Sequence, residues 1–163
     1  MSKILASIKD LSEAKLILNT EVDIIDLKDP SNGALGRLCK NDIEKIVEYV
    51  GQRKLTSSTV GDLPNNINLI SKNVKEISST NIDFIKIGVY ENSYVETLCN
   101  IKSNKKLIAV FFADRFLPTN EEIIQLKNSN FYGVMVDTSK KKSGNLFNFV
   151  TYDDIDDFLK SAR

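Results

Sequence analysis

The chain has 163 residues, of which 42% are apolar and 27% are charged, a composition typical of globular proteins. Lysine and arginine together number 22, as do aspartate and glutamate, and the zero net charge argues against a nucleic-acid binder held by a general basic field. Histidine is absent, which excludes imidazole-based triads and leaves acid–base chemistry to Lys, Asp, Glu, Tyr or Cys.

Short apolar runs alternate with amphipathic segments from one end of the chain to the other. The first half predicts, in order, a strand at 3–8, a short helix from Asp10 to Leu18, a strand at 23–28, a helix at 41–50, a strand at 54–60 and a helix at 66–78. The second half predicts a strand at 84–89, a helix at 93–102, a strand at 107–114, a helix at 119–127, a strand at 133–138 and a last helix capped by Thr151. Capping-box spacing marks two of the helix starts, at Asp10 with Glu13 and at Thr119 with Glu122.

This alternation favours a parallel sheet covered by helices within one domain that spans residues 1–163. Strands such as 84–89 and 107–113 are almost continuously apolar, as expected for strands buried on both faces. A doubly wound open sheet and a (β/α) barrel both satisfy the pattern, and periodicity alone does not separate them.

Charged residues recur at or just after the predicted strand ends. They are Asp26 and Lys28, Asp62, Asp114, and Asp137 with Lys141 four residues later. Because the carboxyl ends of parallel strands form one rim, and active sites of such proteins are assembled on it, these residues are candidates for a shared site. For any single aspartate the alternative is a cap on the following helix or loop.

Two lysines, Lys28 and Lys86, indicate a functional site more strongly than the aspartates do. Asp26 and Lys28 lie two residues apart on one strand, so their side chains share a face, and Lys28 could simply reach into an ion pair with Asp26. Lys86 stands in the middle of an apolar strand, with Gly88 leaving room beside its head group. Burial lowers the pKa of a lysine and so raises the fraction of neutral amine, which makes these lysines candidates for a nucleophile or a base.

Two loops have a composition of interest. Residues 29–36 combine Pro30, which keeps Asp29 extended, with Asn32 and Gly33 as positions for positive φ, but they match no phosphate-binding fingerprint. The basic run 140–142 is read as a solvated loop, with anion binding as the alternative. Cys39 and Cys99 have neither a metal-ligand spacing nor the number needed for a disulfide framework.

Nothing in the sequence predicts a membrane or secretory segment. The longest apolar run, residues 107–113, is far shorter than the roughly 20 residues that span a bilayer. The amino-terminal residues lack the apolar core of a secretory signal, so a cytoplasmic location is expected.

Five segments together resemble one known family. They are residues 23–36 (DIIDLKDPSNGALG), 58–62 (STVGD), 84–90 (FIKIGVY), the pair Ala113-Asp114, and residues 136–147 with Asp137, Lys141 and Phe147. The chain resembles the (5-formylfuran-3-yl)methyl phosphate synthases, which make the furan precursor of methanofuran-type one-carbon carriers.

The resemblance implies a TIM-barrel lyase that condenses two molecules of glyceraldehyde 3-phosphate, with loss of phosphate and water. It implies that Lys28 forms a Schiff base with the substrate and that Lys86 is the proton acceptor. Asp26, Asp137 and Lys141 match further active-site positions of the family. No cofactor and no metal are implied.

This chain differs from the family mainly in being shorter. It continues with two more βα units, so the expectation is an incomplete barrel with six of eight units, ending after the sixth helix. Arg37 and Arg115 stand in or beside motif positions without a family match. Two alternatives stay open: a different Schiff-base aldolase of sugar phosphates, and a non-catalytic fragment or subunit. A triose phosphate is the expected partner, with no nucleic acid, no membrane and possible homo-oligomers.

Overall fold

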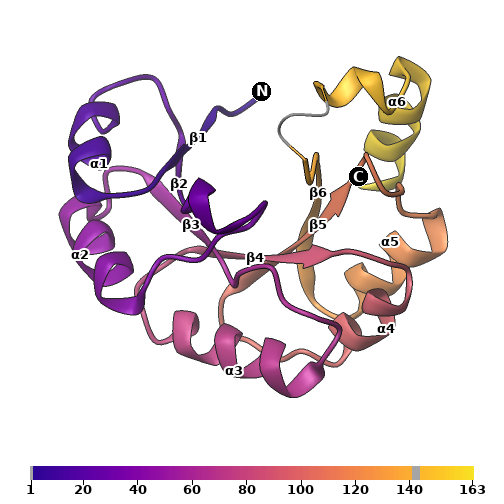
Figure 1. Ribbon diagram of the computed structural model, residues 1–163, viewed down its shortest axis with the longest axis horizontal. Helices are drawn as coiled ribbons and strands as arrows, with labels where there is room; N and C mark the ends of the chain where they lie inside the picture. Colours follow the sequence, from indigo (N-terminus) through magenta and orange to yellow (C-terminus); the bar gives the residue numbers. More distant parts are fainter. Residues whose placement is uncertain (1, 141–143) are drawn as a thin grey trace.

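The computed structural model describes residues 2–140 and 144–163, and this part contains one parallel sheet that curls through about half of a closed barrel (Figure 1). Its strands are β1 (Leu5–Ile8), β2 (Ile24–Leu27), β3 (Leu55–Thr59), β4 (Phe84–Val89), β5 (Lys106–Phe112) and β6 (Phe131–Asp137). They follow one another in chain order, each hydrogen-bonded to the next. A doubly wound sheet reverses its strand order at a switch point, so the sequential order excludes that alternative.

The helices between the strands lie along the outer side of the curl, and β1 and β6 lie at its two ends (Figure 1). They are α1 (Leu11–Ile17), α2 (Lys40–Val50), α3 (Ile67–Ser78), α4 (Ser93–Cys99) and α5 (Asn120–Asn128). The last helix, α6 (Tyr152–Ser161), follows β6, and two short 3-10 helices, η1 (Pro30–Asn32) and η2 (Leu146–Asn148), lie in the loops after β2 and β6. In the part of the chain that the structure describes, no helix is both long and apolar enough to span a membrane.

Side-chain caps explain where most helices begin. Thr119 and Glu122 form the predicted reciprocal capping box. Thr151 does the same with Asp154, a partner that the sequence analysis did not name. Asp10 accepts a hydrogen bond from the Glu13 N–H, but the Glu13 carboxylate accepts from Lys9 rather than from the cap residue. Side-chain caps are therefore present at both helix starts where the spacing predicted them.

The main difference from the predicted elements is the length of α4. It ends at Cys99 instead of Lys102, because the Asn100 N–H bonds the Thr97 carbonyl in a tightened last turn and the chain then leaves the helix. Ile101 is buried just beyond that end. The apolar spacing that predicted a longer helix thus comes from a loop residue that packs into the core.

The core lies between the outer face of the sheet and the helices. Ile25, Leu27, Ile85 and Ile87 point outward from β2 and β4 and are almost completely buried against helix residues such as Ile70. Each fully buried aliphatic side chain of this kind contributes about 1.5–3 kcal/mol relative to exposure. Alternate strand residues point to the opposite, inner face of the curl, which is where polar side chains gather.

Candidate active site

The inner face of the sheet holds a buried carboxylate beside a buried lysine. Asp26 of β2 is 0% exposed and Lys86 of β4 is 3% exposed. The Lys86 Nζ lies 2.5 Å from the Asp26 Oδ2, although β3 separates their strands. A buried charge pair is stable only when its remaining hydrogen-bonding capacity is also used.

Two serine hydroxyls complete the surroundings of Asp26. Ser57 of β3 donates to Oδ1 at 2.6 Å, and Ser7 of β1 donates to Oδ2 at 2.9 Å. The carboxylate thus accepts from three strands at once, which fixes its position on the inner face of the sheet.

Lys28 has a different carboxylate partner from the one that its place in the strand suggested. It follows β2 and is 9% exposed, and its Nζ lies 3.8 Å from the Asp137 Oδ2 at the end of β6. The alternative interpretation of Lys28, an ion pair with Asp26, is wrong, because Lys86 is the lysine that contacts the Asp26 carboxylate. The structure therefore brings together four of the five predicted residues, and Lys141 lies outside the described residues.

The surroundings of Lys86 change its acidity. Burial lowers the pKa of Lys86 below its usual value of 10.5, the Asp26 charge opposes that shift, and the positive charge of Lys28 adds to it. Lys86 and Ser57 also line a largely apolar cavity of about 410 Å³ toward the amino ends of the strands. A lysine in such a place is able to exchange a proton at a lower pH than an exposed lysine.

The lowered pKa of Lys86 predicts a pH dependence of stability. Between the folded pKa and 10.5 the unfolded chain binds more protons than the folded chain, so the unfolding free energy rises with pH across that window and is flat below it. Urea unfolding from pH 7 upward is expected to show this rise in the wild type, relative to the Lys86→Met variant. A difference between the two proteins that is constant or falls with pH would contradict the assignment.

Ser57 offers a direct test of the hydrogen bonds around Asp26. Ser57→Ala is expected to lower the unfolding free energy by about 1–3 kcal/mol, because a buried carboxylate loses a donor. Ser58 is the matched control, since its hydroxyl is equally buried and has no hydrogen-bond partner in the described part of the chain. Ser58→Ala is therefore expected to be close to neutral in the same urea titration, and equal losses from the two variants would contradict the network.

Two of the strand-end aspartates hold loops instead of facing the lysines. The Asp62 Oδ1 accepts hydrogen bonds from the Leu35 N–H and from the Tyr90 hydroxyl. Asp114 accepts from the backbone and hydroxyl of Ser139 and from the backbone of Lys140. Burial raises the pKa of Asp114, but these hydrogen bonds outweigh it and hold that pKa below its usual value. Neither carboxylate accepts from the helix or loop that directly follows it, as the capping alternative supposed; each holds loops that follow other strands.

The loop after β2 folds back against the carboxyl ends of the strands. Asp29 is extended before Pro30, as predicted, and Gly33 has φ 105°, whereas Asn32 does not take positive φ. Gly36 is needed for close approach: a Cβ there would lie 1.9 Å from the Asp29 carbonyl oxygen. Leu35 is consequently buried with Phe112 in a small apolar cluster above the site.

The space beside Gly88 is filled by Tyr90, not left open for the Lys86 head group. A Cβ at Gly88 would lie 2.7 Å from the Tyr90 ring. That ring stacks on Phe112 with centroids 5.0 Å apart, and Phe112 pairs in register with Asp137. Through Phe112, the Tyr90 ring thus packs next to the strand end that carries Asp137, a contact that spacing alone did not predict.

Sequence reasoning also missed Ser7 and Ser57. A signal for Ser57 was available, because β3 reads Leu-Thr-Ser-Ser-Thr and yet lies between two other strands, with four of its five residues buried. Buried strands are usually Val-, Ile- and Leu-rich, so a buried polar strand indicates partners on the inner face.

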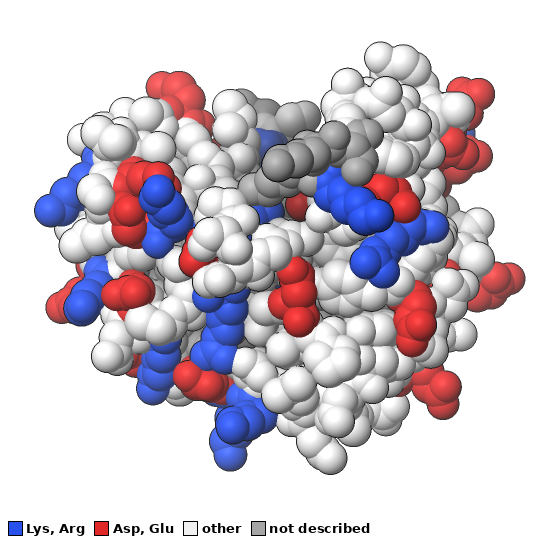
Figure 2. Space-filling model, viewed as in Figure 1, with Lys and Arg blue, Asp and Glu red and all other residues white. Residues whose placement is uncertain are grey.

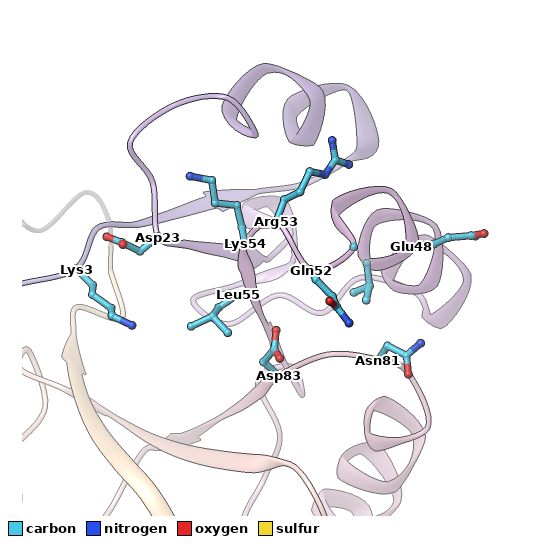
Figure 3. Close-up of a pocket in the computed structure, with 11 residues that line it drawn as sticks. Lys3, Asp23, Glu48, Gln52, Arg53, Lys54, Leu55, Asn81 and Asp83 are labelled. Carbon is cyan, nitrogen blue, oxygen red and sulfur yellow. The ribbon is translucent and has the colours of Figure 1, made fainter.

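The opposite end of the sheet has a larger cavity, of about 860 Å³, at the amino ends of the strands (Figure 3). Four of its charged groups are used in local structure: Asp23 accepts from the Ile4 N–H, Asp83 accepts from Thr56, Lys54 donates to the Thr20 carbonyl, and Arg53 donates to carbonyls at the end of α2. Such groups stabilise the fold and carry no free chemistry. The carboxyl-end site is therefore the better candidate.

The distribution of surface charge and of metal-ligand side chains gives no sign of a metal centre in the described part of the chain. Acidic and basic side chains are interspersed over the face seen in Figure 2, in keeping with the zero net charge. Among residues 2–140 and 144–163, no group of three Cys, Asp or Glu side chains is arranged to hold a metal ion. Cys39 and Cys99 are both free thiols.

Comparison with known sequences gives consistent matches along the whole chain. The family model described as 4-HFC-P synthase matches residues 4–163. The (5-formylfuran-3-yl)methyl phosphate synthase of Methanocaldococcus jannaschii is 31% identical over 175 residues, covering 98% of this chain and 74% of that protein. The Archaeoglobus fulgidus protein of the same name is 29% identical, covering 99% and 75%. This chain thus spans about three quarters of the length of these relatives.

Solved structures with similar folds include an aldolase and a 4-hydroxy-tetrahydrodipicolinate synthase, both at low sequence identity. A catalytic-lysine mutant of Ruminococcus gnavus sialic acid aldolase matches with a TM-score of 0.70 and 12% identity, covering 99% of this chain and 58% of that chain. The 4-hydroxy-tetrahydrodipicolinate synthase of Methylacidiphilum fumariolicum matches with a TM-score of 0.65 and 12% identity, covering 93% and 59%. At these identities the likeness concerns the fold alone.

Proposed function

The chain belongs to the 4-HFC-P synthase family, and from this premise we propose that it makes (5-formylfuran-3-yl)methyl phosphate from two molecules of glyceraldehyde 3-phosphate, as a step toward methanofuran-type carriers. The observation that carries the proposal is the pair of lysines on one inner face, each beside its own carboxylate. The condensation releases one phosphate and two waters, which balances the atoms of the two substrates and the product.

Lys28 would be the nucleophile of this reaction. Its neutral amine attacks the carbonyl carbon of one triose phosphate, and loss of water leaves an iminium that withdraws electrons from the neighbouring carbon. Asp137, whose Oδ2 is 3.8 Å from the Lys28 Nζ, is positioned to carry the proton needed for that loss of water. Lys141, the remaining residue of the resemblance, stays a prediction.

Lys86 would act as the base. It removes a proton from the carbon next to the iminium, and the resulting enamine attacks the aldehyde of the second triose phosphate. Support comes from its lowered pKa and from its contact with Asp26, which stabilises the ammonium formed when Lys86 takes up the proton. Ser7 and Ser57 would hold Asp26 for that task and touch no substrate.

The curled sheet is proposed to be part of a (β/α) barrel of the TIM type that forms one domain. Support comes from the sequential parallel strand order, from the helices on the outer side, and from the fold likeness to the aldolase. The site then lies at the carboxyl ends of the strands, where enzymes with this architecture carry out their chemistry.

Product analysis tests the proposal. The full chain incubated with glyceraldehyde 3-phosphate is expected to release inorganic phosphate and a furan aldehyde phosphate that mass spectrometry identifies. A parallel screen with other triose and tetrose phosphates separates this reaction from that of another Schiff-base aldolase. A sugar phosphate without the furan ring as the main product would favour the aldolase, and a folded protein with no product would overturn the proposal.

A further inference from the structure

A third cavity, of about 450 Å³, opens at the carboxyl ends of the strands above the lysine pairs. Every loop from β2 to β6 contributes to its wall, with Ala34, Asp62, Tyr90, Arg115 and Lys140 as representatives. Tyr90 in that wall stacks on Phe112, whose strand neighbour in register is Asp137. The Tyr90 and Phe112 rings therefore connect the cavity wall to the strand end that carries Asp137, the carboxylate neighbour of Lys28.

Arg115 is presented to this cavity by an aromatic platform. Its guanidinium carbon lies 5.3 Å from the centre of the Tyr90 ring, and Nη1 donates to the Tyr90 carbonyl at 3.5 Å. Arg115 makes no ion pair with any residue of the described part of the chain. An arginine stacked in this way keeps a planar set of N–H donors whose geometry suits two oxygens of a phosphate.

The acidic groups nearby are already used by the protein. Asp62 accepts from the Leu35 N–H and from the Tyr90 hydroxyl, so its Oδ1 is occupied by two donors within the wall. Burial and the hydrogen bond to Asp62 raise the pKa of Tyr90, which keeps that phenol a donor. Asp114 accepts from Ser139 and from the Lys140 backbone, which holds this side of the wall in place.

We infer that this cavity binds a phosphate monoester group of the substrate, with Arg115 and Lys140 as its cations. The inference rests on the proposed function, because two phosphorylated molecules that react at one centre need separate anion sites. A phosphate held at the rim leaves the carbonyl end of the molecule to reach inward to Lys28, and it selects phosphorylated aldehydes over free ones.

The test is a titration of the full chain with inorganic phosphate at fixed ionic strength, followed by calorimetry. Arg115→Gln is expected to weaken binding by about tenfold or more, since it removes charged hydrogen bonds, and Arg115→Lys by less. Arg53→Gln is the matched control, because Arg53 also stacks on a tyrosine, with its guanidinium carbon 5.2 Å from the centre of the Tyr49 ring. Arg53 lies at the opposite end of the sheet, at the amino ends of the strands. The Arg53→Gln variant is expected to bind phosphate like the wild type.

Equal affinity of the wild type and Arg115→Gln, or no phosphate binding by the wild type, would overturn the inference. A second measurement uses borohydride trapping with glyceraldehyde 3-phosphate and with unphosphorylated glyceraldehyde. Arg115→Gln is expected to raise the half-saturating concentration of the phosphorylated aldehyde only, and an equal rise for both would count against the site. Failure of the wild type to trap either aldehyde would overturn the proposed Schiff base, and the phosphate titration still decides the subsite.

Discussion

Asp26→Ala is expected to lower the unfolding free energy by about 3–5 kcal/mol, one of the largest losses available to a single substitution in this chain. Lys86 is 3% exposed and has Asp26 as its carboxylate neighbour at 2.5 Å. Without that carboxylate, Lys86 either stays charged in an apolar surrounding or gives up its proton, and both alternatives cost free energy. The Ser7 and Ser57 hydroxyls lose their common acceptor in the same variant.

Urea unfolding with a double variant separates the pair from simple loss of packing. Asp26→Leu combined with Lys86→Met replaces both charges with apolar groups, and such replacements are often neutral or stabilising. The double variant is therefore expected to regain most of the loss, while having no activity. If the unfolding free energy of Asp26→Ala were within about 0.5 kcal/mol of the wild-type value, the substitution would behave like an ordinary surface substitution. That result would contradict the buried ion pair.

Lys28→Met is expected to reduce turnover by about a thousandfold or more, because it removes the nucleophile and with it the covalent route. The fold is expected to survive, since Lys28 follows β2 and its carboxylate neighbour Asp137 has a side chain that is 33% exposed. Product formation from glyceraldehyde 3-phosphate is the measurement, with urea unfolding as the check on folding.

Lys28→Arg sharpens this test. Arginine keeps a positive charge near Asp137 but does not supply a neutral amine, so it is expected to be as inactive as Lys28→Met. Lys54→Met is the control for loss of a lysine as such, because Lys54 donates to the Thr20 carbonyl at the far end of the sheet. Substantial turnover by Lys28→Arg would show that the lysine acts through its charge and not as a nucleophile.

The sequence predicted the alternation of strands and helices, and it placed the candidate charged residues in or beside the strands where the structure has them. The mid-strand position of Lys86 indicated a buried amine, and this prediction is confirmed. Period-two spacing put Asp26 and Lys28 on one face of a strand; Asp26 lies within β2, whereas Lys28 follows its end. These features are local, because strand geometry alone determines which residues share a face. The caps at Asp10 and Thr119 are confirmed for the same reason.

The pairing of charges across the sheet could not be predicted in this way. Lys86 bonds Asp26 across an intervening strand, and Lys28 pairs with Asp137 from the far edge, because the curl of the sheet brings β2 and β6 toward each other. Curvature and register depend on the packing of all strands, and no spacing in the sequence encodes them. The filling of the Gly88 space by Tyr90 is a similar long-range outcome.

The most direct test of the central claim is to locate the covalent adduct. The folded chain is reduced with borohydride in the presence of glyceraldehyde 3-phosphate, and its peptides are mapped by mass spectrometry. The account predicts a single substrate-derived mass increase on Lys28, which disappears in Lys28→Met. An adduct confined to a different lysine, or no adduct on a well-folded sample, would contradict it.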